Sequence, residues 1–262
     1  MRVVIERGVN AIGSAVINLC TVMGSFTLFL FHAIRCLVTM RPKISKFFVQ
    51  SNRIGVESSL IVMLTGTFTG MVFALQSYIG FQRVGGEQFI GAVVALGMVR
   101  ELGPVLTGLM VTGRACSAIA AEIGTMRITE QIDALETLRI DPFQYLIVPR
   151  ILAGLVIVPC LTIFSMICGI VGGYAICVHV LELSPEDYIS SIRNFVEISD
   201  INGGIIKSCI FGLILTWVGT YKGFYTRGGA RGVVEATTQS VVLSSIMILI
   251  FNYFLTKLLE RM

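Results

Sequence analysis

The feature that most constrains this chain is the length of its uncharged apolar stretches. Residues 58–82 form a run of 25 residues without a single Asp, Glu, Lys or Arg. A helix needs about 20 mostly apolar residues to cross the hydrocarbon core of a bilayer. Hydrophobic residues make up 55% of the chain and charged residues 14%, whereas about 25% are charged in ordinary soluble domains. The sequence therefore predicts a polytopic membrane protein and excludes a soluble enzyme or a nucleic-acid-binding module.

Five stretches are long and apolar enough to cross a membrane. They are residues 58–82, 89–113, 151–181, 201–221 and 236–256. The connections between them are too short to hold a soluble domain. We therefore predict an all-α membrane protein with one domain, residues 1–262, whose five-span core covers residues 45–262.

The N-terminal region, residues 1–44, holds a further uncharged segment at residues 8–34. Its polar residues recur every three or four positions, which gathers them on one face of a helix: Asn10, Ser14, Asn18, Thr21 and Ser25. We favour a helix that lies in the membrane interface, because such a helix needs a polar face. The alternative is a sixth span whose polar face packs against the other helices.

Basic residues alternate between rich and poor connections along the chain. Five lie in residues 35–57, just before the first span, four lie between the second and third spans, and three lie between the fourth and fifth. The two remaining loops hold one each. Because Lys and Arg concentrate in cytoplasmic loops, the rich segments are predicted to be cytoplasmic and the C-terminus to face the other side.

Residues 115–145 form the most informative cytoplasmic segment. Ile128, Ile132 and Leu135 recur at helical spacing, which predicts an amphipathic helix over about 118–138. Asp141 and Pro142 then begin the next helix. The pattern fits equally a helix that docks into a groove on a soluble partner and one that only lies on the membrane surface. On the opposite side, a second short helix is predicted over about 185–197.

Three charged residues lie inside predicted spans. Arg100 and Glu101 lie near the centre of the second span, and Lys207 lies in the fourth. A charge within the bilayer is unfavourable, so these side chains should face a cavity or a partner. Neighbours on a helix point about 100° apart, so Arg100 and Glu101 should not pair with each other. They could line a cationic cavity for a lipid phosphate, or form an internal ion pair such as Glu101 with Lys207.

The run from Val99 to Val105, Val-Arg-Glu-Leu-Gly-Pro-Val, begins a linked pattern. Gly-Arg-Ala follows at 113–115, Ala-Glu-Ile-Gly at 121–124 and Thr-Glu-Gln at 129–131. This pattern closely resembles the MlaE/YrbE family of ABC-transporter permeases. Further similar segments lie at 66–76 and 206–217, so that the resemblance covers roughly residues 45–260.

The resemblance implies a homodimeric permease that moves phospholipids between the inner and outer membranes of a Gram-negative bacterium. The expected location is the bacterial inner membrane. The expected partners are a cytoplasmic ABC ATPase, a STAS-domain protein and a periplasmic MCE-domain protein. The segment 118–138 would be the coupling helix seated on the ATPase, with these candidate contacts: Glu122, Gly124, Arg127, Glu130 and Asp133. The candidate lipid-binding residues are Arg100, Glu101 and Lys207, with walls from Phe73, Gly80, Phe81 and Val84.

The sequence holds no G-x-x-x-x-G-K-[ST] phosphate loop. We therefore expect a permease subunit that is not itself an enzyme, without catalytic residues, metal or cofactor, whose partner ATPase binds ATP and Mg²⁺. The main alternative is an ion-coupled secondary transporter that uses Glu101 and Lys207. An intramembrane hydrolase lacks a recognisable motif, and a scaffold without transport activity is the last alternative.

Overall fold

The computed structural model describes residues 2–39, 44–83 and 85–259, and its regular elements are all helices. In chain order these are α1 (Arg2–Thr39), α2 (Ile44–Phe81), η1 (Glu87–Phe89), α3 (Ile90–Gly97), η2 (Met98–Leu102), α4 (Gly103–Val111), η3 (Thr112–Cys116), α5 (Ser117–Ile128), α6 (Gln131–Thr137), η4 (Phe143–Ile147), α7 (Val148–His179), α8 (Pro185–Phe195), α9 (Ile198–Phe224) and α10 (Gly229–Leu259). η1 is a 3₁₀ turn, and η2, η3 and η4 are π-helical turns.

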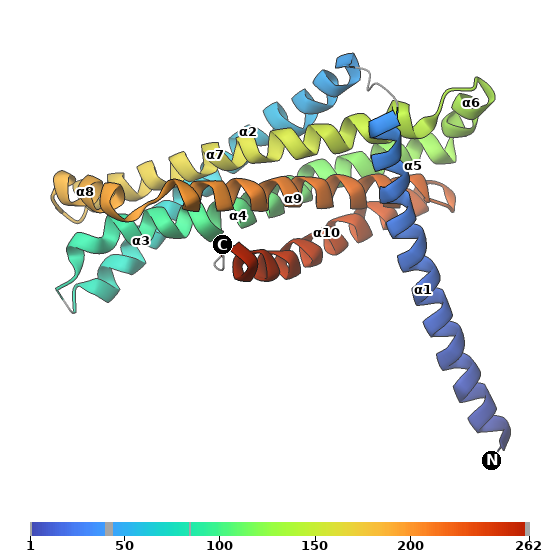
Figure 1. Cartoon of the computed structure of the whole chain (residues 1–262), viewed down its shortest axis with the longest axis horizontal. Helices are drawn as coiled ribbons and strands as arrows, with labels where there is room; N and C mark the ends of the chain where they lie inside the picture. Colours follow the sequence, from blue (N-terminus) through green and yellow to red (C-terminus); the bar gives the residue numbers. More distant parts are fainter. Residues whose placement is uncertain (1, 40–43, 84, 260–262) are drawn as a thin grey trace.

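Five helical rods are long and apolar enough to cross a membrane, as the sequence predicts. They are Ile44–Phe81, Glu87–Ile128, Phe143–His179, Ile198–Phe224 and Gly229–Leu259. The second rod combines η1, α3, η2, α4, η3 and α5 into one nearly continuous helix. The rods run alongside one another, with α7 packed against both α2 and α9 (Figure 1).

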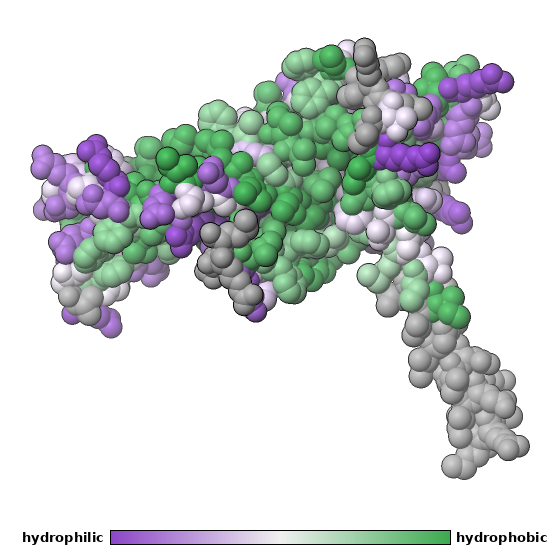
Figure 2. Space-filling model, in the orientation of Figure 1, coloured by the Kyte–Doolittle hydropathy of each residue, from purple (hydrophilic) through white to green (hydrophobic). Residues whose placement is uncertain are grey.

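Hydrophobic side chains cover the middle of the bundle, whereas hydrophilic side chains gather at its two ends (Figure 2). One end carries α6 and the connection between α9 and α10, and the other carries α8 (Figure 1). The basic segments 114–150 and 222–231 therefore belong to the same end. This arrangement agrees with the alternation of basic loops.

α1 leaves the bundle at a steep angle to the five rods (Figure 1). Its C-terminal half is anchored to the bundle: the Phe26 ring stacks on Trp217 with 3.9 Å between ring centroids, and Phe29 is buried. The Ser25 hydroxyl lies 2.8 Å from that of Tyr221. Among the residues whose side chains the structure describes, Met23–Leu37 forms an apolar stretch of α1. The side chains of Asn10, Ser14 and Asn18 lie outside the described residues, and the interfacial position of α1 stays a prediction.

Glycines set the distance between α2 and α7. A Cβ atom added at Gly70 would overlap the backbone carbonyl of Gly169, and one added at Gly66 would lie 2.8 Å from the carbonyl oxygen of Ser165. Membrane helices associate by close packing rather than by the hydrophobic effect, so small residues at such crossings stabilise the pair.

Replacing Gly70 with Ala should separate α2 from α7. Overpacking of this kind costs about 1–3 kcal/mol, more than the gain in helix propensity of up to about 1 kcal/mol. The matched control is Gly80→Ala in the same helix, because a Cβ at Gly80 meets nothing within 4 Å. Thermal unfolding in detergent should therefore show a lower Tm for Gly70→Ala and an unchanged or higher Tm for Gly80→Ala. Equal Tm values would contradict this packing.

Candidate functional site

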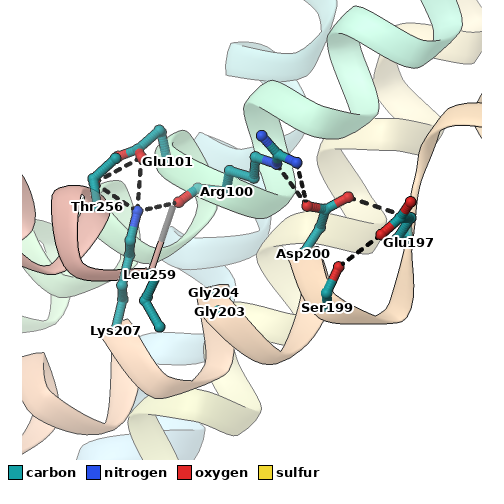
Figure 3. Close-up of a pocket in the computed structure, with 10 residues that line it drawn as sticks. All are labelled: Arg100, Glu101, Glu197, Ser199, Asp200, Gly203, Gly204, Lys207, Thr256 and Leu259. Carbon is teal, nitrogen blue, oxygen red and sulfur yellow. Dashed lines mark hydrogen bonds and ion pairs between the residues drawn. The ribbon is translucent and has the colours of Figure 1, made fainter. Parts of the chain in front are cut away.

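A cavity of about 430 Å³ lies where the second, fourth and fifth rods meet. Its lining combines charged side chains with two glycines of α9 (Figure 3). The residues are Arg100, Glu101, Glu197, Ser199, Asp200, Gly203, Gly204, Lys207, Thr256 and Leu259. We refer to this cavity as the polar pocket. Its volume lies in the range of small-molecule sites, which run from about 300 to 1,000 Å³.

The polar pocket is built around an irregular turn of the second rod. Arg100 and Glu101 lie in the π-helical turn η2, immediately before Pro104. In a regular α-helix the carbonyl of residue 100 would accept a hydrogen bond from the N–H of residue 104, but proline has no N–H. The ammonium group of Lys207 donates to this carbonyl instead, over 2.8 Å. A side chain of the fourth rod thus replaces a backbone bond of the second.

Lys207 also binds the carboxylate of Glu101. Its Nζ atom lies 2.7 Å from Oε1 of Glu101 and 2.8 Å from the Thr256 hydroxyl. Asn252 donates to Oε2 of Glu101 over 2.8 Å. The Lys207 side chain is only 4% exposed. The internal ion pair of Glu101 with Lys207, one of the two alternatives from the sequence, is therefore present. Together with Thr256 and Asn252 it connects the second, fourth and fifth rods.

Arg100 does not pair with Glu101, as the angle between neighbours on a helix predicts, and it binds Asp200 instead. Its Nε and Nη2 atoms lie 2.7 Å and 2.5 Å from Oδ1 of Asp200. The other oxygen of Asp200 accepts the backbone N–H of Glu197 over 3.0 Å, within a capping box that begins α9. The Asp200 side chain is 6% exposed and that of Arg100 is 54% exposed. Of the two cations in the polar pocket, Arg100 is thus the accessible one.

The charge of the polar pocket differs from the cationic cavity that the sequence suggested. Two cations, Arg100 and Lys207, face three carboxylates, those of Glu101, Glu197 and Asp200. Lys207 is buried and neutralised, so it is not a free cation in the described chain. The reason is long-range packing, which brings Glu101 and Asp200 to these cations from sites distant in sequence.

The predicted walls of the cavity do not line the polar pocket. Phe73 and Phe81 pack against a hydrophobic cluster around Ile90 and Val94. Gly80 is exposed on α2. Val84 lies outside the described residues. The structure therefore brings together Arg100, Glu101 and Lys207 but places Phe73, Gly80 and Phe81 elsewhere.

The predicted coupling helix, 118–138, is divided into two helices. α5 ends at Ile128, and α6 covers Gln131–Thr137. Between them Glu130 adopts the left-handed conformation, with a φ of 58°, which a continuous right-handed helix cannot contain. α5 continues the second span, and α6 extends beyond the bundle (Figure 1).

Two of the predicted coupling residues contact neighbouring helices of the bundle. Glu122 binds Arg53 over 2.7 Å and the buried Arg150 over 2.8 Å, which links α2, α5 and α7. Gly124 is buried, and a Cβ there would lie 3.0 Å from the Thr226 hydroxyl. Gly124 is packed within the bundle because α5 is still part of it at this point, whereas the Glu122 side chain is 36% exposed. Contact of these residues with a partner stays a prediction.

The other three coupling candidates lie around the turn between α5 and α6. Arg127 binds Asp133 over 2.6 Å and so closes the turn. Glu130 and Asp133 are exposed. These residues are placed where a soluble partner could contact them.

Sequence reasoning missed the polar partners of the charges in the polar pocket: Glu197, Asp200, Asn252 and Thr256. Two signals were present. Glu197 and Asp200 stand three residues apart before an apolar run, which is the spacing of a capping box. Asn252 and Thr256 stand four residues apart in an otherwise apolar span, which places both on one helix face.

Comparison with known proteins decides the family. The family model described as "Permease MlaE" matches residues 47–258. The chain belongs to the MlaE permease family. It is 44% identical over 249 residues to a probable ABC transporter permease protein of Rickettsia felis, covering 95% of this chain and 96% of the relative.

Other relatives extend the comparison. The chain is 36% identical to the intermembrane phospholipid transport system permease protein MlaE of Haemophilus influenzae, over 96% of this chain and 97% of that protein. It is also 39% identical to the chloroplastic protein TRIGALACTOSYLDIACYLGLYCEROL 1 of Arabidopsis thaliana, over 79% of this chain and 59% of that protein. The predicted resemblance is thus confirmed, and membership of an ABC-permease family argues against the alternative of a secondary transporter.

Replacing Lys207 with Met should destabilise the fold, because it leaves the carboxylate of Glu101 and the carbonyl of Arg100 without their cation. Removal of one partner of a fully buried pair costs about 3–5 kcal/mol, and the cost here should be smaller because the Glu101 side chain is 37% exposed. The double variant Glu101→Gln with Lys207→Met removes both charges and should recover most of the lost stability. Thermal unfolding of the single and double variants in detergent measures this coupling. A single variant as stable as the original chain would contradict the structural role of the pair.

Proposed function

We propose that this chain is the permease subunit of an ABC transporter that moves phospholipids between the inner and outer membranes. Its location would be the bacterial inner membrane. The observation that carries the proposal is the half-exposed guanidinium of Arg100 inside a polar pocket between spans, in a chain related to a phospholipid permease. A membrane-embedded arginine is a functional residue by default, since its burial in hydrocarbon is unfavourable.

In this proposal Arg100 binds the phosphate of the head group. Its Nε and Nη2 atoms face Asp200, and its Nη1 atom has no partner among the described residues. Guanidinium groups bind phosphate oxygens through charge-assisted hydrogen bonds. Acyl chains would lie on the apolar surface of the bundle, where large hydrophobic side chains are exposed. Lys207 and Glu101 would hold η2 in place rather than bind the lipid directly.

The force for transport would enter at α6. The exposed turn at Glu130 and the helix after it are accessible to an ATPase, and α5, α4 and η2 connect this end to the polar pocket as one rod. The ion pairs of Glu122 with Arg53 and Arg150 link α5 to α2 and α7. A displacement of α6 would therefore move several rods together, as in shear motions of packed helices.

The remaining partners follow from the family. We propose a homodimer, because α2 and α10 expose many large apolar side chains that a second copy or lipid can cover. A cytoplasmic ABC ATPase would bind and hydrolyse ATP with Mg²⁺. A STAS-domain protein would accompany the ATPase, and a periplasmic MCE-domain protein would exchange the lipid with this permease.

Replacing Arg100 with Ala should weaken lipid binding while the permease stays assembled. A hydrogen bond to a charged group contributes about 1.5–3 kcal/mol, so bound phospholipid should fall roughly tenfold or more. The control is Arg193→Ala, an exposed arginine on α8 outside the polar pocket. Mass spectrometry of lipids that co-purify with the complete complex measures the effect. Equal lipid content in both variants, or no ATPase in the complex, would refute the proposal.

Replacing Glu130 with Lys should uncouple ATP hydrolysis from lipid movement, because a reversed charge disturbs the docking surface. The matched control is Glu182→Lys, since both glutamates are exposed and left-handed, with φ of 58° and 53°. We expect ATP-driven lipid transfer between vesicles to fall about fivefold or more in Glu130→Lys alone. An equal effect of both variants, or none, would show that α6 is not the docking surface.

A further inference from the structure

The three carboxylates of the polar pocket are not equivalent. Both oxygens of Glu101 are engaged, by Lys207, Thr256 and Asn252. Asp200 is buried between Arg100 and the start of α9. Glu197 differs from both: it is exposed and forms no ion pair among the described residues. The polar pocket therefore keeps one accessible anion as well as one accessible cation.

Glu197 is nevertheless held in place. Its carboxylate accepts the hydroxyl of Ser199 over 3.1 Å and completes the capping box with Asp200. Asp200 stands between Arg100 and Glu197, so that the guanidinium and the free carboxylate lie on either side of one buried acid (Figure 3). Because the same capping box orients both groups, their separation is set by the fold rather than by two independent side chains.

This arrangement carries a formal net charge of −1, from two cations and three carboxylates. A head group with net negative charge would add repulsion to a site that is already negative. A zwitterionic head group adds no net charge, and it can place its phosphate on Arg100 and its ammonium on Glu197. A site discriminates between two ligands when it attracts one and repels the other, as this site would do with zwitterionic and anionic head groups.

We propose that the polar pocket selects zwitterionic phospholipids over anionic ones, with Arg100 binding the phosphate and Glu197 the ammonium group. This inference rests on the proposed function, because it names the lipid class of the same pocket. Glu197 acts here as a specificity-determining residue. Its removal should change which lipid is bound more than how much lipid is bound.

The test uses the complete transporter complex, reconstituted in vesicles of equal parts phosphatidylethanolamine and phosphatidylglycerol and then extracted for lipid mass spectrometry. The original chain should enrich phosphatidylethanolamine about two- to fivefold over the vesicle ratio, the size of one exposed ion pair. Glu197→Gln should return the ratio to that of the vesicle with total lipid within about twofold, since one exposed ion pair contributes little affinity. The matched control, Glu186→Gln on α8, lies outside the polar pocket and should keep the enrichment.

A second variant, Glu197→Asp, distinguishes an effect of the carboxylate charge on lipid selection from an effect on folding. It keeps the carboxylate and should retain most of the enrichment, whereas Glu197→Gln keeps an acceptor for the capping box and should retain the Tm. Enrichment that persists in Glu197→Gln, or is absent from the original chain while lipid is bound, would overturn this inference and leave the proposed function intact. Absence of phospholipid from every variant would instead refute the proposed function.

Discussion

The contact on which the central structure depends is the one between the Lys207 ammonium and the second span. Pro104 deprives the carbonyl of Arg100 of its helical donor, and Lys207 supplies the missing hydrogen while neutralising Glu101. Thr256 and Asn252 of α10 complete the shell. Three spans that are distant in sequence thus share one polar cluster, and removal of Lys207 would leave the carbonyl of Arg100 without its donor and the carboxylate of Glu101 without its cation.

The two neighbouring residues Arg100 and Glu101 have different roles in this cluster. Glu101 pairs with Lys207, and its neighbour Arg100 therefore projects from another side of the helix. There the Arg100 guanidinium binds Asp200 at the surface of the polar pocket. Asp200 also caps α9, which makes the position of Arg100 part of the fold. A phosphate group can approach the free edge of the guanidinium without breaking the buried pair. The same rod continues through α4 and α5 towards α6, so one nearly continuous helix connects the proposed lipid site to the proposed ATPase-docking surface.

The spans could be predicted because the thickness of the hydrocarbon core fixes the length of an apolar helix that crosses it. The charged residues inside the spans could be recognised because charges are rare in such helices. The partners of these charged residues could not be predicted, since the pair of Arg100 with Asp200 joins residues that lie 100 positions apart in the sequence. The pairing of Glu122 with Arg150 could not be predicted for the same reason, and the family resemblance implied only a docking role for Glu122. The division at Glu130 also escaped prediction, because a non-glycine residue in the left-handed region gives no local signal.

The central claim is that the free edge of the Arg100 guanidinium binds a lipid phosphate during transport. Electron cryomicroscopy of the complex with its ATPase, with and without nucleotide, tests it most directly. The account predicts a phospholipid in at least one state with its phosphate within hydrogen-bonding distance of the Arg100 guanidinium, while Lys207 stays on Glu101. Lipid bound only at other positions in every state would contradict it.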